Sequence, residues 1–291
     1  MVWCAKSVSG KPDRMQVRLV VFGLGYCGAA VAGAATGNGL DVAGITRQTD
    51  AATTRAVLAR ATHVLSSVPP GEDDDPVLSR FGTDLDMAPM LRWVGYLSTT
   101  GVYGDRGGRW VDETTPPTPQ SARAVRRLAT EAKWSRLAER RVVDLFRLGG
   151  IYGPGRSAFD ELRAGRARRI VKPGHAFGRI HRDDIVLAVL AAMRQPRAPG
   201  VRVLHLVDDE PAESAAVIAE AARLLGVQPP PEIPYAAALT GMSPMARSFW
   251  AENRKVASRA TQAALGVMWC YPTYREGLHA ILVEEARQGL A

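Results

Sequence analysis

The sequence is poor in cysteine, in aromatic residues and in long apolar runs. Its 291 residues include three cysteines, Cys4, Cys27 and Cys270, and 7% are aromatic. Three thiols without paired or metal-ligand spacing exclude a disulfide framework and a metal–thiolate centre, and they suit a reducing compartment. No apolar run approaches the roughly 20 residues of a membrane helix, and the N-terminus lacks a signal-peptide pattern. We therefore expect a cytoplasmic protein with no membrane partner and no metal.

The composition is that of an ordinary globular protein with a basic balance. The hydrophobic content of 46% is enough for a large core, in one two-lobed unit or in two domains. The formal net charge is +8, with basic residues concentrated at 123–141 and 163–172. Neither stretch interleaves aromatic side chains as a base-stacking surface would, so we expect no nucleic acid. A solvated helix face explains the first stretch, whereas the second is a candidate contact for an anionic substrate.

Apolar, strand-like segments recur along the chain and are separated by helical stretches. They lie at 17–22, 41–46, 63–68, 93–98, 142–147 and 201–207. Between Asp50 and Ala61 the pattern indicates one helix and no further strand. Strands that alternate with helices imply parallel crossovers and an open sheet covered on both faces. The sequence therefore predicts an α/β fold with a doubly wound parallel sheet.

Two further patterns concern local structure. The acidic run Glu72–Asp75 has neither a histidine nor a second carboxylate group beside it, so it predicts a solvated loop rather than an ion site. Thr273 followed by Glu276 forms a capping box. The helix that it begins carries Leu278, Ile281 and Leu282 on one face, so we expect it to be structural.

The stretch 17–28 reads VRLVVFGLGYCG and leads directly into an alanine-rich segment. The order strand, G-x-G-x-x-G, helix is the arrangement that a dinucleotide requires. Gly23 allows a tight turn, Gly25 lets the backbone approach a pyrophosphate, and Gly28 lets helix and strand pack closely. The helix N-terminus then offers free N–H groups to the anion. The expected contacts are Gly23, Leu24, Gly25, Tyr26, Cys27 and Gly28.

The second strand indicates which dinucleotide is bound. It ends in Thr46 and Arg47, where the NAD-preferring arrangement has an acidic residue for the ribose hydroxyls. A guanidinium suits a 2′-phosphate, so NADP(H) is favoured over NAD. The alternative is an exposed arginine in a polar loop. Val68 and Pro69 follow the strand at 63–68, and we expect them beside the cofactor at the carboxyl edge of the sheet.

Several motifs occur in the order typical of one enzyme family. Residues 96–105 read YLSTTGVYGD, 147–156 read RLGGIYGPGR, 179–185 read RIHRDDI, and 253–256 read NRKV before Leu265 and Gly266. The chain resembles the extended and atypical short-chain dehydrogenases/reductases, the NAD(P)-dependent epimerase/dehydratase-like family, from about residue 16 to 285. The resemblance implies a Rossmann-type domain that carries a smaller, discontinuous substrate lobe.

The resemblance also implies catalytic roles. In the family, the serine or threonine at the position of Thr99 polarises a substrate oxygen; the alternative is a hydroxyl that caps the strand end. The tyrosine and lysine of the Y-x-x-x-K pair fall here on Arg123 and Arg127. Arginine stays protonated, so Arg123 cannot exchange a proton, whereas Arg127 can donate to the nicotinamide ribose or stabilise an oxyanion. Tyr103 and Tyr152 are the alternative acids, and Tyr103 is the predicted catalytic one.

The same motifs suggest the domain boundaries. We expect residues 1–14 to be a disordered extension and 15–152 with about 182–208 to form the Rossmann domain. About 153–181 with 209–291 would form the substrate lobe. Tyr152, Arg156 and His181 are the expected substrate contacts; the alternative for His181 is that, with Asp184, it ties the lobe to the sheet. The resemblance makes a homodimer through helices near 82–92 and 121–140 plausible.

The leading hypothesis is an NADP(H)-dependent oxidoreductase or epimerase-like enzyme. Its substrate would be small and polar, of anionic or sugar-nucleotide type, and a hydride would pass between nicotinamide and substrate. A catalytically silent NADP(H)-binding sensor or scaffold is the alternative, because the usual tyrosine and lysine are absent. A nucleic-acid-binding module has only the net charge in its favour.

Overall fold

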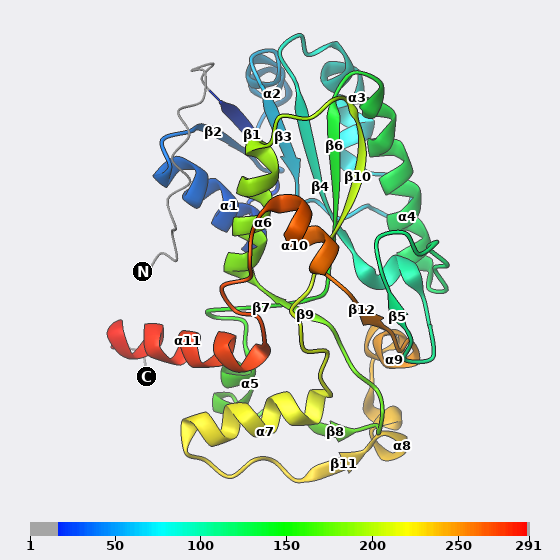
Figure 1. Cartoon of the computed structure of the whole chain (residues 1–291), viewed down its shortest axis with the longest axis vertical. Coiled ribbons are helices and arrows are strands. Elements are labelled where there is room, and N and C mark those ends of the chain that lie inside the picture. Colours follow the sequence, from blue (N-terminus) through cyan, green and yellow to red (C-terminus); the bar gives the residue numbers. More distant parts are fainter. Residues whose placement is uncertain (1–16, 290–291) are drawn as a thin grey trace. The chain divides into compact units, whose positions relative to one another are not determined.

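The structure, a computed structural model, describes residues 17–289. The expected extension at 1–14 lies outside the described residues. A six-stranded parallel sheet with the order β10-β6-β4-β3-β1-β2 forms the centre of the fold (Figure 1). Its strands are β1 (Arg18–Phe22), β2 (Asp41–Ile45), β3 (His63–Ser66), β4 (Trp93–Thr99), β6 (Val142–Leu148) and β10 (Gly200–Leu206).

The chain reverses its direction of travel across the sheet at β1. It passes from β1 to β2 and then returns to β3 on the other side of β1, with Val20 paired in register to Ala43 and to Val64. Such a topological switch point leaves a crevice at the carboxyl ends of the strands, where α/β proteins bind their ligands. The single helix expected between Asp50 and Ala61 is present as α2 (Ala51–Leu58), with no extra strand.

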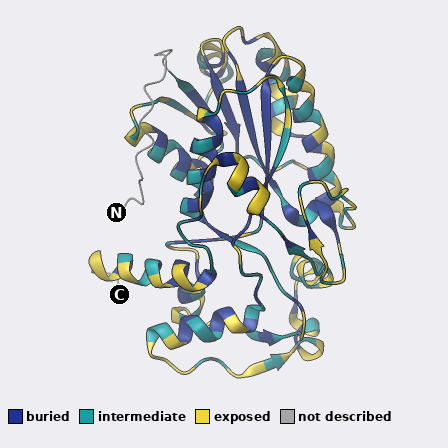
Figure 2. Cartoon of the chain, in the orientation of Figure 1, coloured by how far each residue is buried: buried dark blue, intermediate teal, exposed yellow. Residues whose placement is uncertain are grey.

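Helices cover both faces of the sheet. On one face α2 packs with α3 (Pro76–Met87) and α4 (Ala122–Ser135) in one apolar cluster with strand side chains such as Val64 and Val94. On the other face lie α1 (Tyr26–Gly37) and α6 (Arg182–Arg194). Because both faces are covered, β3 and β6 are buried along their whole length (Figure 2).

The described chain divides into two compact units. Unit 1 contains the described residues up to Ser98, with 129–146 and 185–203, and unit 2 contains 99–128, 147–184 and the described residues from 204 on. This division differs from the expected boundaries mainly at 99–128, which group with unit 2, as do 147–152, 182–184 and 204–208. The reason is that the V-Y-G segment after β4 packs in a cluster with Val207 and Val256, which come from late in the chain.

Unit 2 is built from short strand pairs and helices. Its small sheets pair β7 with β9, β8 with β11 and β5 with β12. The strands are β5 (Trp110–Val111), β7 (Gly150–Tyr152), β8 (Arg169–Val171), β9 (Arg179–His181), β11 (Glu232–Pro234) and β12 (Lys255–Val256). The helices are α5 (Ala158–Arg163), α7 (Ser214–Leu225), α8 (Tyr235–Ala238), α9 (Pro244–Ala251), α10 (Arg259–Leu265) and α11 (Tyr274–Arg287). The short 3-10 helices of unit 2 are η1 (Thr100–Tyr103) and η3 (Leu239–Gly241), whereas η2 (Arg136–Glu139) belongs to unit 1.

Local predictions were confirmed in part. The capping box of Thr273 and Glu276 begins α11 as expected. The strand expected at 63–68 ends at Ser66, and the helix expected near 82–92 ends at Met87, where Ala88 is extended. The prediction of a solvated loop was wrong for Asp75, which is buried and caps α3. Within residues 17–289 no helix is both long and apolar enough to cross a membrane.

Candidate functional site

The loop between β1 and α1 holds three glycines, each for a different physical reason. Gly23 has a φ of +84°, which side chains of L residues rarely adopt. A Cβ at Gly28 would lie 1.9 Å from the carbonyl oxygen of Gly23, so only glycine allows this close packing. A Cβ at Gly25 would meet no atom within 4 Å. The space beside Gly25 is therefore open, as the approach of a pyrophosphate to the backbone requires.

The N-terminus of α1 has features of an anion-binding site. Gly25 is its N-cap and provides no side-chain cap, and the first turn carries no acidic residue. The backbone N–H groups of a helix N-terminus and the positive end of the helix dipole favour a phosphate there. Tyr26 opens the helix, Cys27 is buried, and Leu24 packs against the bare backbone of Gly44.

The loops after β1, β2 and β3 meet in unit 1. Gly23 donates from its N–H to the carbonyl of Ile45 at 2.9 Å, and the N–H of Ser67 donates to the carbonyl of Phe22 at 2.9 Å. The Ser67 hydroxyl also donates to the Gly23 carbonyl at 2.7 Å. Val68 packs against the same glycine, and Pro69 follows it. The structure thus brings the glycine loop and the β3 end together, and Ser67 fixes the loop.

Thr46 and Arg47 lie in the turn that follows β2. The Thr46 N–H donates to the Thr49 hydroxyl at 3.0 Å, which closes the turn. Arg47 is exposed, and its guanidinium forms no hydrogen bond or ion pair with residues 17–289. Arg47 therefore follows a strand adjacent to β1 with its charge available to a phosphate.

Thr99 ends β4 and caps the 3-10 helix η1. Its hydroxyl oxygen accepts a hydrogen bond from the Gly101 N–H at 3.1 Å. The hydroxyl thus caps η1, whereas the alternative drawn from the sequence was a buried hydroxyl that caps the end of the strand. The hydroxyl proton of Thr99 is not used in that bond, and the side chain is partly exposed. Its role as an oxygen polariser stays a prediction.

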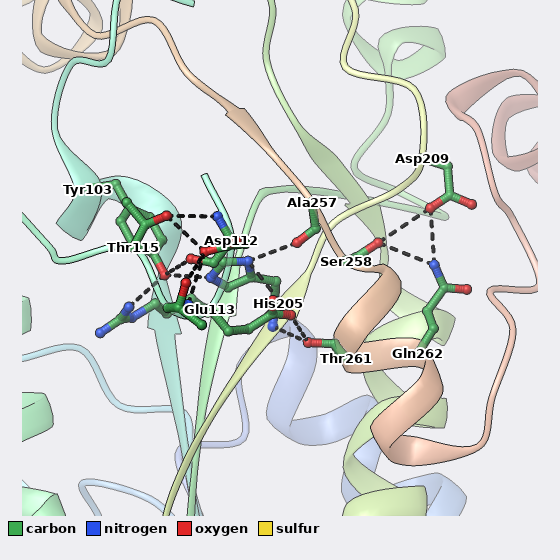
Figure 3. Close-up of polar contacts among 12 residues, drawn as sticks. Tyr103, Asp112, Glu113, Thr115, His205, Asp209, Ala257, Ser258, Thr261 and Gln262 are labelled. Carbon is green, nitrogen blue, oxygen red and sulfur yellow. Dashed lines mark hydrogen bonds and ion pairs between the residues drawn. The ribbon is translucent and has the colours of Figure 1, made fainter. Parts of the chain in front are cut away.

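Tyr103 lies in a buried polar network of unit 2 (Figure 3). Its hydroxyl accepts a hydrogen bond from Arg147 Nη1 at 2.7 Å and lies 2.5 Å from His205 Nε2. His205 Nδ1 lies 2.8 Å from the Ala257 carbonyl, which only accepts, so Nδ1 carries the hydrogen and Nε2 accepts from Tyr103. Burial lowers the pKa of His205, which keeps the ring neutral. With Tyr103 fully buried, the network favours a structural anchor over the predicted proton-transfer role.

The two arginines at the tyrosine and lysine positions lie one turn apart on α4. Arg123 stacks over the Phe249 ring at 5.4 Å, and Arg127 is 9% exposed. Burial lowers the pKa of Arg123, and the positive charge of Arg127 lowers it further. Both guanidiniums keep their charge at neutral pH, so the helix presents two fixed cations where the family has a proton donor.

Two of the three predicted substrate residues line one cavity of about 390 Å³ in unit 2. Tyr152 and Arg156 are on its wall, whereas His181 is not. The His181 ring instead packs edge-on against Tyr152 with centroids 5.2 Å apart, and burial lowers its pKa to about 4. Asp184 accepts hydrogen bonds from the backbone N–H groups of Cys270 and Tyr271 at 2.7 and 3.1 Å. This agrees with a structural role for the H-R-D-D segment.

The sequence analysis missed Ser67, His205 and Arg179. Ser67 and His205 are held by partners more than 40 residues away in the chain, so no local pattern marks them. Arg179 opens the quoted 179–185 motif, and its side chain bonds the carbonyl oxygens of both Phe177 and the distant Ala212. Arg147 stood within the quoted R-x-x-x-I-Y-G-P-G motif and could have been singled out there. Its partner, Tyr103, lies 44 residues earlier in the chain.

Comparison with known proteins gives relatives of two kinds. No family model matches the chain. The sequence is 32% identical to the 3-diazoavenalumate denitrifying reductase of a Streptomyces species over 175 residues, 58% of this chain and 55% of that protein. It is 30% identical to Protein YeeZ of Escherichia coli K12 over 152 residues, 50% and 51% of the two chains. The match thus spans about half the length of these curated relatives.

Solved structures match over nearly the whole chain. A conserved protein of unknown function from Silicibacter pomeroyi DSS is 40% identical with a TM-score of 0.82, covering 92% of this chain and 99% of that one. MoeE5 in complex with UDP-glucuronic acid and NAD is 22% identical with a TM-score of 0.74, covering 94% and 100%. Human epimerase family protein SDR39U1 with NADPH is 19% identical with a TM-score of 0.72, covering 91% and 99%.

The sheet order and the glycine loop define a Rossmann-like α/β fold, as the sequence predicted, and this fold is shared with the epimerase and dehydratase structures. The chain belongs to the same family as the Silicibacter protein, because the two are 40% identical over almost all of that protein's length.

Proposed function

We propose that the chain is an NADP(H)-dependent oxidoreductase that acts on a small polar substrate. The observation that carries the proposal is the open space at Gly25 beside the N-terminus of α1, which has no side-chain cap. The names of similar proteins support it: the Streptomyces relative is a reductase, and the structures of SDR39U1 and MoeE5 contain NADPH and NAD.

The residues fit the cofactor in the following way. The backbone of Gly25 and the first turn of α1 would hold the pyrophosphate, and Arg47 would bind the 2′-phosphate. Bound NADPH supplies a hydride. Thr99 donates its free hydroxyl proton in a hydrogen bond to a substrate oxygen. Arg127 contributes a fixed positive charge that stabilises developing negative charge, but it transfers no proton.

The test measures the affinity of the full chain for NADPH and NADH by titration calorimetry. Arg47→Asp should weaken NADPH binding about tenfold or more, because it removes charge-assisted hydrogen bonds to a phosphate. NADH binding should change little. Arg60→Asp is the matched control. Arg60 is exposed and precedes β3, so it lies at the amino ends of the strands, away from the carboxyl ends where the cofactor is proposed to bind.

Two results would contradict the proposal. Equal losses for both nucleotides in Arg47→Asp would reject the preference for NADP(H). A wild-type chain that binds neither nucleotide would reject the oxidoreductase function altogether.

A second candidate function is a catalytically silent NADP(H)-binding sensor. The observation that favours it is the pair of arginines at the Y-x-x-x-K positions, together with the complete burial of Tyr103. Stoichiometric NADPH binding without turnover of aldehydes, ketones or nucleotide sugars would support the sensor. Turnover that Thr99→Ala abolishes, with NADPH affinity unchanged, would support the enzyme.

A further inference from the structure

The cavity in unit 2 has no ligand assigned by the proposed function. Its volume of about 390 Å³ falls within the roughly 300–1,000 Å³ of small-molecule sites. Its walls come from the loop after β7, from α5, β9 and α7, and from α11. Segments from across the later half of the chain thus form one concave site.

The wall of this cavity carries an excess of positive charge. Three guanidiniums line it, against two carboxylates, those of Asp160 and Glu161. Asp160 accepts hydrogen bonds from the backbone and hydroxyl of Ser157 at 2.7 and 2.8 Å, and Glu161 pairs with Arg166 at 3.2 Å. Both carboxylates therefore have partners in the wall, and the balance is one net positive charge.

Arg179 is the most firmly held of the three guanidiniums. Its Nη1 donates to the carbonyl oxygens of Phe177 and Ala212, both at 2.9 Å. Asp208 is a neighbouring carboxyl that interacts with its charge. Burial raises the pKa of Asp208 to about 8, so that carboxyl is largely protonated at neutral pH and cancels little of the charge. The two bonds use two of the five guanidinium donors of a residue that lines the cavity.

Much of the rest of the wall is apolar. Val217 and Leu278 line the cavity together with Tyr152 and Tyr274, whose rings belong to the surrounding hydrophobic cluster. A fully hydrated inorganic anion would gain nothing from such a surface, whereas a compound with a hydrocarbon or aromatic body would bury apolar area there.

We propose that this cavity binds a small organic carboxylate, with the carboxylate on Arg179 and the apolar body against Val217 and Leu278. A planar monoanion matches both the guanidinium fork and the single excess positive charge. The site goes beyond the proposed oxidoreductase function and does not depend on it, since every wall residue belongs to unit 2.

The probes are benzoate and 3-phenylpropanoate, compared with their neutral amides and with inorganic phosphate. Calorimetry and saturation-transfer NMR on the full chain should show binding of at least one carboxylate, with its amide about ten- to a hundredfold weaker. Phosphate should not compete with the bound carboxylate. Failure of both carboxylates to bind, equal binding of the amide, or displacement by phosphate would each overturn the proposal.

Variants locate the site. Arg179→Met should abolish carboxylate binding, and Ala158→Phe, which fills the cavity without removing a charge, should weaken it at least tenfold. Arg223→Met is the control, because Arg223 is on α7, outside this cavity, and pairs with Glu220. If circular dichroism shows that Arg179→Met is unfolded, Ala158→Phe decides. Unchanged binding in Ala158→Phe would overturn the assignment. NADPH affinity, measured in parallel, should be the same in all variants, which separates this inference from the proposed function.

Discussion

Asp144 shows how much a single residue contributes to unit 1. Its carboxylate is fully buried in β6 and accepts hydrogen bonds from Arg197 at 2.9 Å, Arg202 at 2.8 and 3.0 Å, and the Trp93 indole at 2.8 Å. The two arginines are partly buried. One carboxylate thus pairs with two cations beside β6.

Asp144→Asn should lower the free energy of unfolding by about 3 kcal/mol, because it leaves two guanidiniums without their counter-charge. Denaturant unfolding of the full chain measures the change. Asp41→Asn is the control: its carboxylate is largely exposed and pairs with Arg18 at 3.5 Å, so the loss should stay below about 1 kcal/mol. Equal effects of the two substitutions would refute this account of Asp144.

Hydrogen bonds between individual side chains were the least predictable feature of the sequence. Gly25 and Arg47 could be singled out because the reason for each is local. Gly25 belongs to a backbone turn, and Arg47 follows directly after a predicted strand. The anchoring of Tyr103 could not, because its partners Arg147 and His205 follow 44 and 102 residues later. A hydrogen bond between such positions leaves no periodic trace in the sequence.

At the scale of elements, α3 begins at a buried cap. Asp75 Oδ1 accepts hydrogen bonds from the N–H groups of Val77 and Leu78, both at 2.9 Å, and Oδ2 accepts from the Trp134 indole at 3.3 Å. The carboxylate therefore fixes the start of α3 and joins it to α4. The acidic run contains one structural residue among solvated neighbours.

Asp75→Ala should destabilise the chain by about 1–2 kcal/mol, through loss of the cap and of the indole's partner. Asp73→Ala, two residues earlier in the same run and exposed, should change stability by less than about 0.5 kcal/mol. Thermal or denaturant unfolding compares the two variants. If both behave alike, the cap does not contribute as the hydrogen bonds indicate.

The six strands of the sheet were predicted to within two residues at each end. Buried parallel strands are mostly apolar on both faces, so they stand out as continuous runs such as Leu19–Phe22 in β1. The short pairs of unit 2 were not predicted. A strand of two or three residues is too short to show a pattern in the sequence. In addition, β5 and β12 pair although they lie more than 140 residues apart in the chain.

At the scale of the whole molecule, buried titratable groups set the dependence of stability on pH. Burial lowers the pKa of His63 and of His181 to about 4, and it raises the pKa of Asp184 to about 6 and that of Asp208 to about 8. Between about pH 7.5 and 9 the histidines are largely neutral in both the folded and the unfolded chain, because their unfolded pKa is about 6.5. Asp184 is largely ionised in both, so Asp208 dominates this window.

The free energy of unfolding should fall by roughly 1 kcal/mol as the pH rises from 7.5 to 9. A carboxyl whose pKa is raised in the folded chain stabilises the fold at low pH, and this stability is lost as the pH rises through the folded pKa. Asp208→Asn, which mimics the protonated acid, should remove the decline. Asp209→Asn, at the exposed neighbour, should retain it. A wild-type stability that does not change over this window would contradict the expectation.

The order of strands and helices, the glycine loop and the charge at the end of β2 follow from the sequence alone, because each depends on residues that are adjacent in the chain. Only the tertiary structure decides which buried polar groups pair and which side chains enclose the cavity around Arg179. These contacts join positions far apart in the sequence, and their strength depends on the removal of water when the units fold.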